Sequence, residues 1–113
     1  MFKKSRYYRI ESIEKNQESY GPNFWNAGYK YSYTPISCAM KYIAKIADPY
    51  MNAVLRSNQV DYVVVRSENE QLIYIKVTGR NKTIDKFINE VFASDDQFLK
   101  RFSMQQVPKC YAY

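Results

Sequence analysis

Histidine is absent from the 113 residues of this chain, which removes the commonest general base and the commonest metal ligand of enzymes. The sequence also has no Cys-x-x-Cys pair, no phosphate-binding loop and no Gly-x-Gly pattern. Few catalytic classes remain once these groups are missing. We therefore expect no enzymatic activity, no catalytic residue, no metal and no cofactor.

Long apolar runs are missing too. No stretch approaches the roughly 20 apolar residues that cross a bilayer, and residues 1–10 are basic without the apolar segment of a signal peptide. The two cysteines, Cys38 and Cys110, are far apart, which is typical of reduced, buried thiols in a cytosolic protein. The sequence therefore predicts a cytoplasmic location and no membrane partner.

Glycine and proline are scarce, at three and four residues, whereas hydrophobic residues make up 46% of the chain. This composition is typical of a folded protein, and the length suits one packed core. We predict a single α/β domain over residues 1–113.

Acidic residues are lacking between Ser19 and Ala47, where aromatic residues and lysines are frequent. The whole chain has a formal charge of +6 and twelve tyrosines, and residues 1–45 hold eight lysines and arginines against three acids. Cations neutralise phosphates and aromatic rings stack on bases, so this combination indicates a surface for nucleic acid.

Alternation and helical spacing predict the order strand, helix, strand, strand, helix, strand. Strands are expected at residues 6–14, 60–67, 71–78 and 105–113, and helices at 34–47, 48–55, 81–92 and 94–102. This is the order of the ferredoxin-like (βαββαβ) fold, an α+β sandwich in which an antiparallel sheet carries two helical segments on one face. Its first and third strands are central, and Pro108 suits the fourth strand at an edge.

An irregular aromatic insertion, residues 16–34, follows the first strand. We expect it to fold back onto the body, with a short hairpin at residues 29–33. Two arrangements stay open: the insertion packs on the second sheet face, or it leaves that face exposed. Trp25 is correspondingly either an anchor of the insertion's own core or part of an interface.

The sheet face opposite the helices is predicted to carry rings beside cations. Its members are Tyr7, Arg9, Tyr62, Arg66, Tyr74 and Lys76, with Lys30, Lys41 and Lys45 as a flanking cationic patch. The layout resembles that of the RNA-recognition module, although residues 72–78 lack its glycine-aromatic motif. We therefore predict a non-enzymatic module that binds nucleic acid, or a nucleic-acid-containing complex, by stacking and phosphate contacts.

The alternative is docking on another protein. A small, tyrosine-rich chain also suits an inhibitor or adaptor of the phage or mobile-element type, which docks on a nucleic-acid-handling host protein such as a nuclease. Buried aromatic residues and arginines anchor such interfaces. The candidate interface residues are Trp25, Tyr29, Tyr31 and Arg56. The sequence does not set the oligomeric state.

Overall fold

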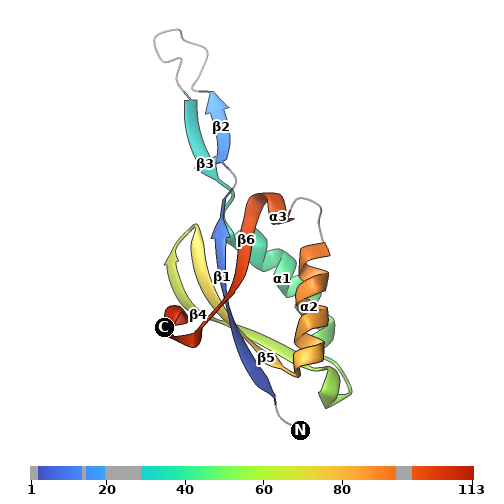
Figure 1. Ribbon diagram of the computed structural model, residues 1–113. Helices are drawn as coiled ribbons and strands as arrows, with labels where there is room; N and C mark the ends of the chain where they lie inside the picture. The colour runs from blue at the N-terminus through green and yellow to red at the C-terminus, as the bar shows by residue number, and fades with distance from the viewer. Residues whose placement is uncertain (1–2, 14, 20–28, 94–97) are drawn as a thin grey trace.

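The computed structural model describes residues 3–13, 15–19, 29–93 and 98–113, with the backbone alone for residues 15–19 and 29–32. These residues form an α+β fold in which two long helices cover one face of a four-stranded antiparallel sheet and a short C-terminal helix lies on the other face (Figure 1). Four α-helices and one short 3-10 turn, η2 (Arg56–Asn58), occur in the described part of the chain.

The four-stranded sheet contains β1 (Lys4–Ser12), β4 (Val60–Asn69), β5 (Leu72–Gly79) and β6 (Phe102–Val107). The strands lie in the order β4-β5-β1-β6, and each neighbouring pair is antiparallel. The predicted antiparallel sheet is confirmed, with its first and third strands, β1 and β5, at the centre and β6 at an edge.

The hydrophobic core lies between this sheet and the helices α1 (Ile36–Met51) and α2 (Asn81–Ala93). Side chains of a strand alternate between its two faces, so every second residue of β1 and β5 points toward the helices. These residues include Tyr8, Ile10, Ile73, Ile75 and Val77, and the helices contribute Ile43, Ala47, Ile84, Phe87 and Val91.

The expected helix break at Asp48 and Pro49 is wrong, because α1 continues through Pro49 to Met51. Inside a helix a proline removes one N–H and crowds the carbonyl four residues earlier, so the continuation through Pro49 needs stabilisation from other contacts. Tyr50 holds this last turn on the core, with its ring centroid 5.5 Å from that of Phe87. Tertiary packing therefore outweighs the local signal.

The last strand is shorter than expected. A short helix, α3 (Phe98–Arg101), precedes β6 as predicted, but β6 ends at Val107. Pro108 then begins the helix α4 (Lys109–Ala112), with its carbonyl accepting a hydrogen bond from the Tyr111 N–H at 3.0 Å. The expected strand over residues 105–113 is therefore replaced, past Val107, by a turn that brings the chain back over the sheet.

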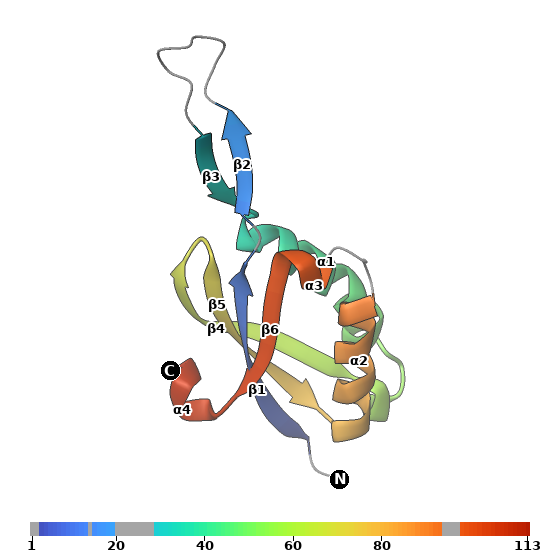
Figure 2. The same cartoon turned by 45° about the horizontal axis from the view of Figure 1, so that its top comes forward.

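The described part of the insertion is a separate hairpin of β2 (Lys15–Ser19) and β3 (Tyr29–Tyr33). Both views show these strands projecting beyond the end of the main sheet (Figures 1 and 2). The expectation that the insertion folds back onto the body is thus wrong for β2 and β3. Residues 20–28, including Trp25, lie outside the described residues.

Candidate functional site

The open face of the sheet, opposite α1 and α2, was expected to present rings and cations. The register of β1 with β5 sets Tyr7 opposite Lys76 and Arg9 opposite Tyr74, all four on this face. The prediction that these residues share a face is confirmed. Whether these four side chains are accessible to a ligand depends on which residues pack over them.

Two of the rings on the open face are buried. Tyr7 and Tyr74 are 8% and 7% exposed, and they pack with Ala112, which is fully buried. We call this group, with the partly buried Val65, Leu72 and Val107, the tyrosine cluster. Burial raises the pKa of Tyr7, and a hydrogen bond with Tyr113 adds to the effect. In this arrangement neither ring offers a face on which a base could stack.

The arginines beside the tyrosine cluster have partners. Arg9 binds Glu11 at 2.7 Å, and this hydrogen bond is the main reason that the pKa of Arg9 is raised. The Arg66 guanidinium lies 4.4 Å from the centroid of the Tyr74 ring and pairs with Glu68. Phosphate would have to compete with these contacts, so the open face is a second small core rather than a free cationic surface.

Tyr62 lies on the opposite face from the one predicted. It is paired with Val77 of the core and packs against that core, whereas Val63 is opposite Lys76 on the open face. The assignment of faces along the first half of β4 was therefore reversed. The reason is that Val60 to Val65 offers apolar residues on both faces, so alternation alone cannot choose between them.

Arg66 nevertheless lies on the open face, as expected. A register shift between Val64 and Arg66 inserts an extra residue and leaves Arg66 opposite Tyr74. Such a bulge changes which residues share a face on either side of it. Tyr62 and Arg66, an even number of residues apart, consequently lie on different faces.

Three cations that have no ion-pair partner among the described residues gather at another place, where β1 begins and β5 ends. Lys3, Arg56 and Arg80 line a hollow of about 640 Å³ together with Ser57 and Gln59. No acidic side chain lines this hollow among the described residues, and none of the ion pairs described involves these three cations. The hollow is therefore suited to an anionic group.

A second hollow, of about 450 Å³, lies beside the first and shares Lys3 and Gln59 with it. Lys76 and Tyr62 line it, together with one acidic side chain, Asp61. Lys3, Arg56, Lys76 and Arg80 thus surround two adjoining hollows, and we call this group the basic end.

Backbone geometry explains why these cations meet. β1 and β5 are antiparallel, so residues just before β1 and just after β5 lie at the same end of the sheet. Gly79 lets the segment after η2 come close, since a Cβ on Gly79 would lie 2.9 Å from the Gln59 carbonyl oxygen. The missing side chain of Gly79 therefore allows Arg56 to approach Arg80.

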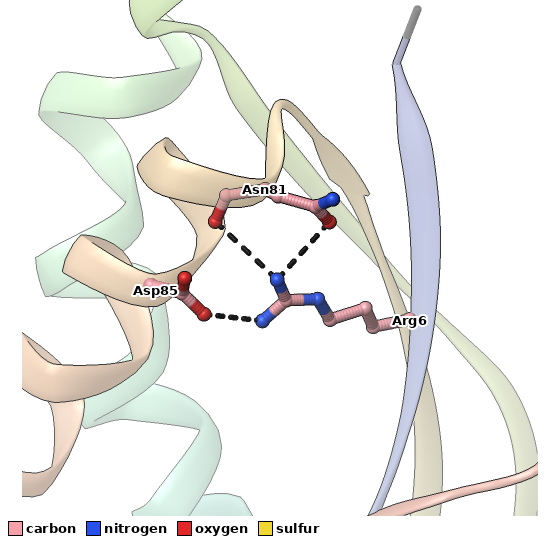
Figure 3. A network of polar contacts seen from close by, with 3 residues as sticks. All are labelled: Arg6, Asn81 and Asp85. Atoms are coloured by element: carbon pink, nitrogen blue, oxygen red, sulfur yellow. Dashed lines mark hydrogen bonds and ion pairs between the residues drawn. The ribbon is translucent and has the colours of Figure 1, made fainter.

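Arg6 fixes the start of α2 beside β1 (Figure 3). Its guanidinium donates hydrogen bonds to Asp85 Oδ1 at 2.6 Å and to Asn81 Oδ1 at 3.0 Å, and the bond to Asp85 is the main reason that the pKa of Arg6 is raised. Arg80 immediately precedes α2, so this contact also limits where Arg80 can lie.

Five predicted site residues join neither the basic end nor the open face: Lys41, Lys45, Lys30, Tyr29 and Tyr31. Lys41 and Lys45 are exposed on α1, which lies on the covered side of the sheet. Lys30, Tyr29 and Tyr31 belong to β3 in the projecting hairpin, and only their backbone is described. The turn η2, which contains Arg56, lies at the other end of the molecule from that hairpin, so the structure separates Arg56 from Tyr29 and Tyr31 (Figure 1).

Sequence reasoning did not select Lys3 and Arg80 as site residues. The available signal was the topology of the sheet. Lys3 precedes β1 and Arg80 follows β5, so the two cations meet only if β1 and β5 pair in an antiparallel sheet. That pairing was implicit in the predicted fold, so it could have identified both residues.

Within the described ranges, no three acidic or cysteine side chains gather as metal ligands, and no helix has the length and apolar character needed to span a bilayer. Cys38 and Cys110 are both free thiols. Comparisons of the chain with protein-family models, with curated proteins and with solved structures give no match.

Proposed function

We propose that this protein is a non-enzymatic module that binds nucleic acid, or a nucleic-acid-containing complex, through its basic end. The observation that carries the proposal is the hollow lined by Lys3, Arg56 and Arg80, in which no described acidic side chain neutralises the cations. Neighbouring cations without partners favour the phosphates of a nucleic-acid backbone, because binding releases condensed counterions. The proposed contacts therefore differ from stacking on Tyr7 and Tyr74.

Lys76 and Tyr62 extend the proposed interface into the adjoining hollow. Lys76 supplies a further phosphate contact, and the Tyr62 ring supplies an apolar wall for a sugar or base. Phosphate contacts carry no sequence information, so we expect little sequence preference.

We further propose that the fold is ferredoxin-like. The strand order β4-β5-β1-β6, with α1 between β1 and β4 and α2 between β5 and β6, supports this assignment. In such a fold the start of the first strand and the end of the third lie together, which is where Lys3 and Arg80 occur.

The test is a salt titration of binding to fluorescent single-stranded DNA and RNA. The variant Arg56→Gln/Arg80→Gln should weaken binding by at least about tenfold, because it removes two charged contacts. It should also reduce the slope of log affinity against log salt by about 1.4, the value for two phosphate contacts to a single strand.

The matched control is Lys41→Gln/Lys45→Gln, which removes the same charge from exposed positions on α1. We expect this control to leave the slope unchanged. Equal slopes for the two double variants would show that net charge alone governs binding and would contradict the basic end as the site.

The alternative, docking on a nucleic-acid-handling host protein, is favoured by one observation. Val54 and Leu55, just before Arg56, are 98% and 62% exposed. Capture of one host protein after complete nuclease digestion would support this alternative if Val54→Ser/Leu55→Ser abolished it. The control is Leu99→Ser, at an exposed residue of α3.

A further inference from the structure

The outer edge of β4 is open. β4 is the outermost strand at one edge of the order β4-β5-β1-β6, and no strand in the described ranges pairs with its other side. Val63 and Val64, in the middle of this edge, are 51% and 43% exposed. A long apolar edge presents unpaired N–H and C=O groups that can take up an additional strand.

Only the first half of this edge is regular. Register shifts occur between Val64 and Arg66 and between Ser67 and Asn69, and Glu68 adds a charge paired with Arg66. Bulges and charges are common protections of an edge against pairing. The stretch that remains available for a new strand is residues 60–64.

Asp61 restrains even this stretch. The Tyr62 N–H donates a hydrogen bond to Asp61 Oδ1 at 2.8 Å, so this N–H points away from β5. The N–H and C=O groups of successive residues point to alternate sides of a strand, so those of Val60 and Val64 also point away from β5. An incoming strand must therefore displace the Asp61 carboxylate to pair with Tyr62.

Charge favours an acidic partner. Lys3 and Lys76 line the hollow next to Val63, and Asp61 is the one acidic side chain that lines it among the described residues. A second copy of this chain would bring the same cations and another formal charge of +6 to the edge. Complementary charge therefore selects an acidic segment of another protein over self-association.

We propose that residues 60–64 of β4 take up an extended acidic segment of a partner protein as an additional strand, and that Asp61 limits this pairing. Apolar side chains of the segment contact Val64 and Tyr62 on one face, and acidic side chains on the other face lie toward Lys76. This role goes beyond nucleic-acid binding, since it rests on backbone groups of β4 rather than on the hollow around Arg56 and Arg80.

The probe is a short fluorescent peptide of alternating valine and glutamate, with its binding followed by anisotropy and by hydrogen exchange of the Val64 amide. We expect binding and slower exchange at Val64. Val64→Pro removes an outward N–H without removing a bond to β5, and it should weaken binding by more than about tenfold. The matched control, Gln106→Pro, places the same residue at an exposed position of the opposite edge strand, β6, and should bind the peptide normally.

Asp61→Ala should bind the peptide roughly fivefold more tightly, because it frees the Tyr62 N–H for one additional hydrogen bond. This gain keeps the proposal testable if Val64→Pro fails to fold, which thermal unfolding would reveal. The peptide with N-methylated valines, which cannot pair, should not bind, and the peptide with lysine in place of glutamate should bind more weakly.

Equal binding of the N-methylated peptide, or no gain from Asp61→Ala, would overturn the proposal. A concentration-dependent dimer that Val64→Pro abolishes would overturn it too, by assigning the edge to a second copy. Nucleic-acid binding should persist in Val64→Pro. A failure of the proposed strand addition can therefore be distinguished from a failure of the proposed nucleic-acid binding at the basic end.

Discussion

Cations lie close to aromatic rings both at the tyrosine cluster and at the basic end, yet the two regions differ in whether these groups are available to a ligand. In the tyrosine cluster the rings of Tyr7 and Tyr74 are buried, and the neighbouring Arg9 pairs with Glu11. At the basic end Arg56 and Arg80 line a hollow without an acidic partner in the described structure. Similar composition thus supports a core in one place and a candidate binding surface in the other.

The difference follows a rule that can be applied to the sequence. Residues two apart in a strand share a face, so an acid two positions after an arginine can pair with it. Arg9 with Glu11 and Arg66 with Glu68 follow this spacing, and both pairs form. Lys76 is followed at this spacing by Thr78 and has no ion-pair partner in the part of the chain that the structure describes. A cation in a strand is therefore a better binding candidate when no acid occupies its own face nearby.

The largest expected effect is on stability, and it distinguishes two residues of β5 that lie two positions apart on the same face. Tyr74→Ala should lower the free energy of unfolding by about 3 kcal/mol, because it removes a buried ring from the tyrosine cluster. Lys76→Ala should leave that free energy nearly unchanged and weaken nucleic-acid binding instead. Denaturant unfolding and anisotropy test both variants, and a folded Tyr74→Ala protein that had lost binding would reverse the comparison.

The next effect is the pH dependence of the free energy of unfolding that the buried phenol of Tyr50 should cause. Burial, with a hydrogen bond to Glu90, raises the pKa of Tyr50 to about 12. In the unfolded chain this phenol titrates near pH ~10, so between about pH 10 and 12 the unfolded state loses a proton that the native state keeps. The free energy of unfolding should therefore fall with rising pH, by up to about 2.5 kcal/mol from Tyr50.

Denaturant unfolding across this pH range measures the loss. The control is Tyr50→Phe, in which the dependence should be flatter by the same amount. An unchanged pH dependence in Tyr50→Phe would mean that other groups cause the loss.

A somewhat smaller effect should alter the basic end through its backbone. Gly79→Ala places a Cβ 2.9 Å from the Gln59 carbonyl oxygen and 3.2 Å from Val60 Cγ2. The segment after η2 must shift, which should destabilise the fold by about 2 kcal/mol and move Arg56 away from Arg80. We expect weaker nucleic-acid binding in the folded variant. An unchanged salt slope would show that binding does not need this close approach.

The smallest expected effect is the difference in salt slope between two variants that each remove one arginine charge. Arg9→Gln removes a partner of Glu11 and should change stability by less than about 1 kcal/mol, with the salt slope of nucleic-acid binding unchanged. Arg80→Gln should reduce that slope by about 0.7. Salt titrations of both variants measure the difference, and equal slopes would remove the distinction between paired and unpaired cations.

The central part of the fold was predictable because its signals are local and agree with one another. The apolar alternation of Leu72 to Val77 and the helical spacing of Ile84, Phe87 and Val91 each predict the element observed. The face of Tyr62 was not predictable, because residues 60–65 offer apolar side chains on both faces and the bulge between Val64 and Arg66 breaks the alternation that would relate Tyr62 to Arg66.

The candidate site was predictable only in part. Alternation correctly set Tyr7, Arg9, Tyr74 and Lys76 on one face, but burial of the two rings depends on Ala112, which is distant in sequence from both. The short helix α4 that carries Ala112 has too few residues to show a period. The sequence of a strand does not reveal that a segment distant in sequence will bury one of its faces.

The projecting hairpin has a further consequence for how the insertion can change. Backbone hydrogen bonds fix the chain on both sides of it, from the Ile13 N–H to the Arg101 carbonyl and from the Ile36 N–H to the Glu70 carbonyl. β2 and β3 pair with each other and form a sheet separate from the main one. A change in the length or sequence of the hairpin would therefore first affect these two hydrogen-bonded positions. The insertion can thus vary while the domain that carries it keeps its stability.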